Sequence, residues 1–237
     1  ARPPAVRHYK IACIVEGHGE AESVPELVDR WIRWRRFSNF SVCRPAVRTT
    51  GSGAFLAPYN PARQVGIEYY VEVALRNSPN AILVLRDADD FCLQVGADEP
   101  GLGPRLASRA RAVHPAMPIG VVIANREFEA WALASLSRIR QAGLIESGRR
   151  LEEAHPMGQS GFRPILPERP RDCKGRIAEL LGRSYSSAVD QRKLVREICF
   201  TPAACRRAPS LGKFLRELER LAIEARCFPA RPGFRGG

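Results

Sequence analysis

Lysine is scarce in this chain: only 4 of its 37 basic residues are lysine, and the other 33 are arginine. The seven cysteines are odd in number and form no Cys-x-x-Cys pair, which argues against a zinc ribbon and against a disulfide framework. No apolar stretch is long enough to span a bilayer, and the first residues lack the apolar centre of a secretory signal. We therefore expect a soluble, cytoplasmic protein that has no membrane partner.

Acidic residues are also few, so the formal net charge is +12 and the isoelectric point is about 10.0. A positive balance of this size favours association with polyanions, chiefly nucleic acid. The alternative is an arginine-rich composition whose charges are simply solvated. We favour nucleic acid, because the acidic cluster at residues 87–90 needs an anionic partner to make chemical sense.

Short apolar runs alternate with helical patterns through the first 140 residues. Runs at 10–16, 40–47, 80–87 and 119–124 are typical of buried parallel strands. Apolar residues at helical spacing predict helices from residue 20 onward and over 61–77, 104–114 and 127–139. Strands that alternate with helices predict an α/β fold, with a Rossmann-like core and a mostly parallel four-stranded sheet flanked by helices.

The pattern changes near residue 143, which suggests two parts. Residues 10–142 are expected to form the α/β core. Residues 143–237 are expected to form an irregular linker, rich in proline and glycine over 154–172, and a helical extension packed on the core. Within the extension, helical patterns cover 174–182, 190–200 and 209–226, and the last residues form a basic tail.

Carboxylates stand at the ends of two predicted strands. Glu16 follows the first apolar run, and Asp87, Asp89 and Asp90 follow the third. In open α/β sheets the chemistry gathers at the carboxyl ends of the strands. Asp87 and Asp89 face the same way in an extended segment, and several crowded carboxylates favour a divalent cation that relieves their repulsion. Oxygen-only ligands predict Mg²⁺ or Mn²⁺ at Glu16, Asp87 and Asp89; for Asp90 a solvated acidic loop is an equal alternative.

A Rossmann dinucleotide site is the fold-level alternative. Gly17-His18-Gly19 follows the first strand, but a third glycine is missing from the spacing Gly-x-Gly-x-x-Gly. The negative charge of Glu16 would also repel a pyrophosphate. We therefore rank this alternative last.

The ordered set of motifs resembles the Toprim superfamily, the catalytic domain of topoisomerases, bacterial primases and overcoming-lysogenization-defect nucleases. The resemblance covers roughly residues 10–225, and its finer pattern is similar to a bacterial branch often encoded beside ATPases in defence loci. The motifs that carry it are Val15-Glu16-Gly17-His18-Gly19-Glu20, Arg86-Asp87-Ala88-Asp89-Asp90, Asn125-Arg126-Glu127-Phe128-Glu129-Ala130-Trp131, Asp172-Cys173-Lys174-Gly175, Tyr185 with Asp190-Gln191, and Pro209-Ser210.

The resemblance implies further site residues and partners. In Toprim nucleases an acidic residue near Glu20 can serve a second metal, and Lys174 looks like a counterpart of the lysine in the second metal site of the overcoming-lysogenization-defect enzymes. The resemblance also implies an ATPase partner and a role in anti-phage defence. For Glu20 the alternative is a favourable contact with the amino end of a helix, and for Lys174 it is a solvated surface charge.

Other candidates rest on position alone. Glu127 and Glu129 follow the fourth predicted strand, and because they are two residues apart they should not share a helical face. Glu127 is slightly preferred as a metal ligand, and for both residues a favourable interaction with the helix dipole is an equal alternative. Arg44, Arg48 and Arg86 are candidates to line a phosphate path, and for any one of them an ordinary surface charge is the favoured alternative. For His18 two roles stay open: to donate to a phosphate, or only to line the turn. Phe128 and Trp131 are expected in the core rather than as base-stacking residues. The catalytic set is therefore Glu16, Asp87, Asp89 and Lys174.

These residues point to a metal-dependent nuclease, or a nuclease-like Toprim subunit, that hydrolyses phosphodiester bonds, with DNA the preferred substrate. The second hypothesis is a non-catalytic subunit that binds nucleic acid or regulates an ATPase complex. A primase-like nucleotidyl transferase is a third, without a zinc-binding or template-gripping module to support it. Strandedness, activity without a partner and homo-oligomer formation are left open.

Overall fold

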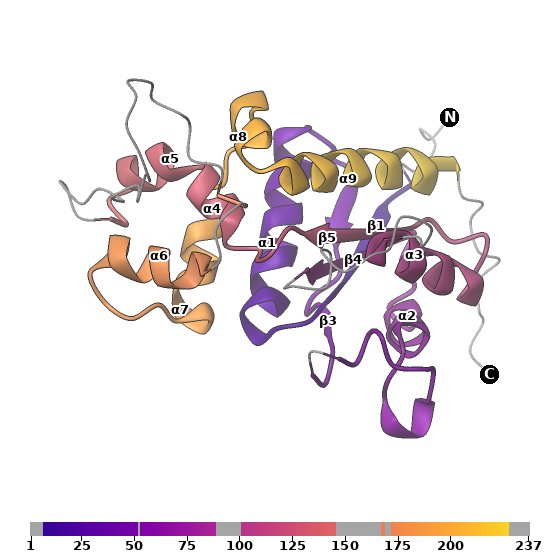
Figure 1. Cartoon of the computed structure of the whole chain (residues 1–237). Helices are drawn as coiled ribbons and strands as arrows, with labels where there is room; N and C mark the ends of the chain where they lie inside the picture. Colours follow the sequence, from indigo (N-terminus) through magenta and orange to yellow (C-terminus); the bar gives the residue numbers. More distant parts are fainter. Residues whose placement is uncertain (1–6, 52, 89–100, 146–166, 169–171, 228–237) are drawn as a thin grey trace, which may run out of the picture.

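A computed structural model of the protein describes residues 7–51, 53–88, 101–145, 167–168 and 172–227 (Figure 1). Within these residues five strands form one parallel sheet in the order β2-β1-β4-β5, and β3 also pairs with β1. The strands are β1 (Tyr9–Val15), β2 (Phe40–Val42), β3 (Val47–Arg48), β4 (Ala81–Asp87) and β5 (Ile119–Ala124). The predicted α/β class and Rossmann-like parallel core are confirmed.

Nine α-helices and one short 3₁₀ turn, η1 (Pro61–Arg63), accompany the sheet in the described residues. The helices are α1 (His18–Trp34), α2 (Ile67–Leu75), α3 (Leu102–Val113), α4 (Ala130–Ala134), α5 (Leu136–Gln141), α6 (Cys173–Leu181), α7 (Ser187–Val195), α8 (Pro202–Arg207) and α9 (Pro209–Cys227). Each predicted helix has a counterpart, and α8 was not predicted. None of the described helices is long and apolar enough to cross a membrane.

The single strand predicted over residues 40–47 is in fact two short strands, which is why the sheet has five strands and not four. Pro45 lies between them, and proline has no N–H to donate to a ladder. Cys43 still donates its N–H to Ile11 O at 2.8 Å, and the pairing with β1 resumes at Val47.

The helix predicted over residues 61–77 is wrong in its first part. The side chain of Asn60 accepts a hydrogen bond from the N–H of Arg63 at 3.1 Å and closes a 3₁₀ turn. Gln64 and Gly66 then have positive φ values of 55° and 94°, so α2 begins only at Ile67. Local side-chain-to-backbone bonding has replaced the start of the helix.

Side chains of the sheet alternate between two apolar cores. Ile11, Cys13 and Val15 of β1 face α1 and α9, whereas Ala12 and Ile14 face α2 and α3. This period of two explains the continuous apolar runs in the sequence, because both faces of the sheet are covered. Figure 1 shows α9 lying along one side of the sheet and α2 and α3 on the other.

The C-terminal helices complete the layer begun by α1. Leu211, Phe214 and Leu218 of α9 belong to the same buried core as Val24 and Leu27 of α1. The division between residues 142 and 143 stays a prediction. In space, α9 nevertheless covers strands of the first part directly.

The strand order reverses between β1 and β4. The chain passes from β1 to β2 on one side, and β4 then returns to pair with the other side of β1. In open α/β sheets the crevice at such a switch point, at the carboxyl ends of the strands, is where ligands bind. Glu16 directly follows β1 and Asp87 ends β4, the two strands that flank this point.

Candidate functional site

Glu16 and Arg86 form an ion pair at the switch point. Arg86 Nε donates to Glu16 Oε2 at 3.3 Å, and the Arg86 side chain is only 1% exposed. The pair joins the ends of β1 and β4 under the surface. The expectation that Arg86 lines a phosphate path is therefore corrected: its guanidinium is buried beneath the strand ends, where a nucleic-acid backbone does not reach it.

Glu20 caps the first helix. Its Oε2 accepts hydrogen bonds from the backbone N–H groups of Glu16 at 3.2 Å and Gly17 at 3.0 Å. These donors precede α1 and would otherwise be unsatisfied, so the carboxylate stabilises the start of the helix. Glu20 therefore has the structural role that was its alternative, and its buried charge also acts on Asp87.

Asp87 is the titratable group most changed by its surroundings at this edge. Its Oδ1 accepts a hydrogen bond from the N–H of Phe128 at 2.8 Å. Burial raises the pKa of Asp87 well above its ordinary value, and the charges of Glu20 and Glu129 raise it further, while Lys174 and the Phe128 N–H act in the opposite direction. Desolvation and the neighbouring carboxylates together therefore disfavour the ionised form of Asp87.

Glu127 and Glu129 converge on Lys174. Lys174 Nζ lies 3.4 Å from Glu127 Oε1 and 4.0 Å from Glu129 Oε2. The expectation that residues two apart could not share a face assumed a helix from residue 127, whereas α4 begins only at Ala130. Because both glutamates precede the helix, their side chains are free to turn toward the same cation.

Glu127 has a second structural task. Its Oε2 accepts the N–H of Cys173 at 2.7 Å, at the first residue of α6. Glu127, which the sequence favours as a metal ligand, thus uses one oxygen on a helix terminus and the other on Lys174.

Glu129 is the more enclosed carboxylate. It is 2% exposed, and its Oε1 accepts hydrogen bonds from Tyr185 Oη at 2.9 Å and Gln191 Nε2 at 3.3 Å. Its Oε2 is buried and has no hydrogen-bond partner among the described residues. Burial raises the pKa of Glu129, and Lys174 opposes the shift. Sequence reasoning ranked this residue second; the signal was its place directly before the fully buried run of α4.

Lys174 is positioned by the first turn of α6. Asp172 Oδ1 accepts the N–H of Gly175 at 2.8 Å and caps α6, while the neighbouring Cys173 is fully buried. Burial would lower the pKa of Lys174, but the carboxylates of Glu129, Glu127 and Asp87 together raise it above its ordinary value. Lys174 therefore stays charged, and it borders an open hollow of about 500 Å³ that Tyr185 and Ser187 also line.

The remaining predicted nucleic-acid contacts are on the surface. His18 is the first residue of α1 and is exposed, close to the carboxylate edge. Arg44 lies 3.3 Å from Asp29 and 3.6 Å from Glu26, so its charge is already balanced. Arg48 is exposed on β3, beside the end of β1.

The donor set fits a hard cation in chemistry. Asp87 and Glu129 offer oxygen atoms only, which are the ligands that Mg²⁺ and Mn²⁺ prefer, whereas Oε2 of Glu20 is already bonded to two backbone N–H groups. In the described residues, however, no three acidic, histidine or cysteine side chains lie close enough to hold an ion together. Asp89 and Asp90, two of the predicted acidic residues, lie outside the described residues.

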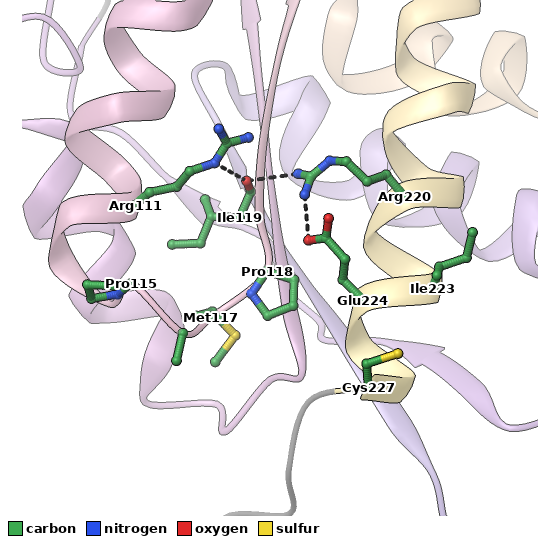
Figure 2. Close-up of a pocket in the computed structure, with 10 residues that line it drawn as sticks. Arg111, Pro115, Met117, Pro118, Ile119, Arg220, Ile223, Glu224 and Cys227 are labelled. Atoms are coloured by element: carbon green, nitrogen blue, oxygen red, sulfur yellow. Dashed lines mark hydrogen bonds and ion pairs between the residues drawn. The ribbon is translucent and has the colours of Figure 1, made fainter.

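A second hollow, of about 600 Å³, lies away from the carboxylates between α3 and α9 (Figure 2). Arg111 Nε and Arg220 Nη2 both donate to Ile119 O at 3.0 Å, at the start of the edge strand β5. Its lining brings no group of perturbed carboxylates together. We therefore place the candidate site at Asp87, Glu129 and Lys174.

No family model matches the chain, and no curated protein matches it. Among solved structures, the chain is similar to the C-terminal region of the Burkholderia pseudomallei OLD protein, at 18% identity and over 92% of this chain and 98% of that chain. The TM-score is 0.33. So loose a likeness carries no functional argument, and a function for this chain has to be argued from its own residues.

Proposed function

We propose that the protein is a Toprim-like, metal-dependent nuclease or nuclease subunit that hydrolyses phosphodiester bonds in nucleic acid. The observation that carries this proposal is the gathering of the carboxylates of Glu20 and Glu129 around Asp87 at the switch point of the sheet. Enclosing such charge is costly unless a cation or a reaction makes use of it. The motif resemblance and the net charge of +12 support the same substrate class.

Each side chain has a task in this proposal. Asp87, Glu16 and Asp89 would supply oxygen ligands, and Glu129 would provide the oxygen that lacks a hydrogen bond. Mg²⁺ or Mn²⁺, when bound, would supply Lewis-acid stabilisation of phosphoryl oxygens. Lys174, held cationic beside the open hollow, would attract a phosphate oxygen and offset the charge that develops on it. Tyr185 orients Glu129 through its hydroxyl.

The test is cleavage of DNA and RNA by the full chain with Mg²⁺ or Mn²⁺, compared with Asp87→Ala. We expect cleavage to fall by about a thousandfold in this variant, the upper end of the loss seen when one stabilising group is removed from an active site. Glu72→Gln is the matched control, because Glu72 is a carboxylate that binds Tyr59 on the surface. Full cleavage by the Asp87 variant would reject the assignment.

A non-catalytic binding or regulatory subunit is the second candidate, and the position of Lys174 favours it. A lysine between Glu127 and Glu129 neutralises the carboxylates that a dication would use. Lys174→Ala separates the two functions. If the lysine assists catalysis, cleavage falls at saturating metal; if it replaces the metal, Mn²⁺ binding measured by calorimetry becomes tighter and no cleavage is found in either protein.

An ATPase partner and a role in anti-phage defence extend the proposal. They come from the resemblance alone, and phage-challenge assays of cells that carry wild-type or Asp87→Ala protein would test the second of them. Protection that does not depend on Asp87 would argue for the non-catalytic candidate.

A further inference from the structure

The end of α1 that lies farthest from the carboxylates carries a cluster of arginines and aromatic rings, which we call the α1-end patch. Its rings and the arginines packed on them are Trp34, Arg35, Phe37, Phe200 and Arg226. Arg36, which lies between Arg35 and Phe37 in the chain, is counted with them. They come from the end of α1, the loop before β2, the loop before α8 and the end of α9. The candidate site at Asp87 makes no use of them.

Guanidinium groups and rings alternate across the patch. Arg35 lies 5.7 Å from the centre of the Trp34 ring and 5.6 Å from that of Phe37, and Arg226 lies 4.5 Å from that of Phe37. Trp34 also meets Phe200 edge to face at 5.6 Å. The cations therefore hold the rings in place, and little side-chain freedom remains to be lost when a ligand binds.

Trp34 is far more exposed than the other tryptophans of the chain. It is 55% exposed, whereas Trp31 and Trp131, the other two tryptophans, are buried. A large indole left in water beside charged groups is typical of a binding surface. The free face of the ring is the part of the patch that a planar ligand would cover.

The patch also keeps positive charge available. Arg36 is exposed, and within the described part of the chain its side chain makes no ion pair; the same is true of Arg226, whose guanidinium lies over rings. Arg35 is paired with Glu219 at 2.6 Å. Two uncompensated guanidinium groups beside an exposed indole suit a ligand that has both negative charge and flat faces.

We infer that the α1-end patch binds single-stranded nucleic acid, with a base stacked on Trp34 and phosphates at Arg36 and Arg226. An unpaired strand offers base faces and phosphates at once, whereas in a duplex the base faces are covered. A second copy of the chain would bring the same positive charge against itself, and an acidic peptide would leave the indole without a partner. The inference goes beyond the proposed function, because this binding needs neither metal nor cleavage.

The patch and the carboxylates lie at opposite ends of α1, whose 17 residues span about 25 Å at about 1.5 Å per residue. Binding at the patch and chemistry at Asp87 are therefore separable by mutation. Trp34→Ala should weaken binding and leave the carboxylate edge intact, and Asp87→Ala should do the reverse.

The experiment measures the binding of a fluorescein-labelled oligo-dT of about 12 nucleotides, within the known range of single-strand sites. The full chain is used with EDTA, at low salt, and anisotropy is recorded. We expect Trp34→Ala to weaken binding by about fivefold to a hundredfold, the measured range for loss of one stacked base. Trp34→Phe should retain most of the affinity, and saturating oligo-dT should quench the tryptophan emission of the wild-type protein.

Tyr59→Ala is the matched control, because Tyr59 is also an exposed ring, 44% exposed, but is bound to Glu72 and not surrounded by arginine. The inference is overturned if Trp34→Ala binds oligo-dT as the wild type does, or if Tyr59→Ala loses as much. It is also overturned if poly-glutamate competes as well as oligo-dT, or if light scattering shows that Trp34 mediates self-association. None of these outcomes affects the cleavage test at Asp87.

Discussion

The two ends of α1 place charge in opposite ways. At its start, Glu20 and Glu129 are buried and Asp87 is half-buried, and desolvation together with the charges of Glu20 and Glu129 raises the pKa of Asp87. At its end, arginines lie on the surface against aromatic rings, where water solvates them. Buried charge of one sign is expensive and suits a reactive site, whereas exposed charge is inexpensive and suits reversible binding of a polyanion. We expect the two regions to act independently, so that a variant in one leaves the other unchanged.

After Asp87→Ala, the largest effect is expected for Glu129→Gln, which removes a buried charge from the carboxylate region but keeps a side chain that can accept from Tyr185. Cleavage should fall by about a hundredfold. Oligo-dT binding in EDTA should change by less than about twofold, because the α1-end patch does not contact Glu129. A large loss of oligo-dT binding would show that the two regions are coupled.

Gly19→Ala should disturb the carboxylate region through packing. A Cβ at this position would lie 2.7 Å from Ser187 O and closer still to Gln191 Oε1, and Gln191 donates to Glu129. We expect the free energy of unfolding to fall by about 1–3 kcal/mol in urea denaturation, because α7 must move away from α1.

Gly53→Ala is the control for this effect, since a Cβ there meets nothing within 4 Å. Its change in the free energy of unfolding should stay within about 0.5 kcal/mol. If both variants unfold alike, the close approach of α1 and α7 at Gly19 is not a determinant of stability.

The raised pKa of Asp87 predicts a stability that depends on pH. Its pKa is higher in the folded than in the unfolded state. The wild type therefore loses stability as the pH rises from about 3.9, the ordinary carboxyl value, to above the raised pKa of the folded state. Asp87→Asn removes this loss. The variant should therefore be more stable than the wild type at neutral pH, and the difference should shrink on acidification.

Bound metal should make the wild type more stable than Asp87→Asn. If Asp87 helps to bind Mn²⁺, adding the ion raises the melting temperature of the wild type, and EDTA abolishes the increase, whereas Asp87→Asn does not respond. Thermal unfolding at several pH values, with and without Mn²⁺, measures both effects. Equal stability of the two proteins at every pH would contradict the half-buried, crowded position of Asp87.

The smallest effect is expected for Arg36→Asn in the α1-end patch. Arg36 has a φ of 56°, and asparagine tolerates this left-handed conformation. Removing one phosphate contact should lower the salt dependence of oligo-dT binding by about one unit of the log–log slope, with uniform weakening across sequences. Arg192→Gln, which only breaks a surface ion pair with Glu22, should leave the slope unchanged.

Much of the fold could be predicted because it depends on local pattern. The apolar runs of β1, β4 and β5 are covered on both faces, so their sequences are continuous and easy to identify. Elements whose limits depend on a single hydrogen bond were harder. The break at Pro45, the turn closed by Asn60 and the late start of α4 at Ala130 all shifted boundaries.

The candidate site was predictable only in part. Glu16 and Asp87 were identified because strand ends can be recognised from apolar runs, and Lys174 through the resemblance of its motif. The burial of Arg86, the capping bond of Glu20 and the enclosure of Glu129 by Tyr185 and Gln191 depend on how the chain folds around them. No local pattern encodes the contacts that join distant segments.

The sequence by itself determined the α/β class, the parallel strands and the edge at which acidic residues gather, since periodicity and composition follow from burial of each face of the sheet. Only the tertiary structure decided which carboxylates share Lys174, which arginine is buried, and that rings and arginines meet at the far end of α1. The physical reason is that charge–charge energies depend on distance and desolvation, and both are set by how α4, α6, α7 and α9 pack against the sheet.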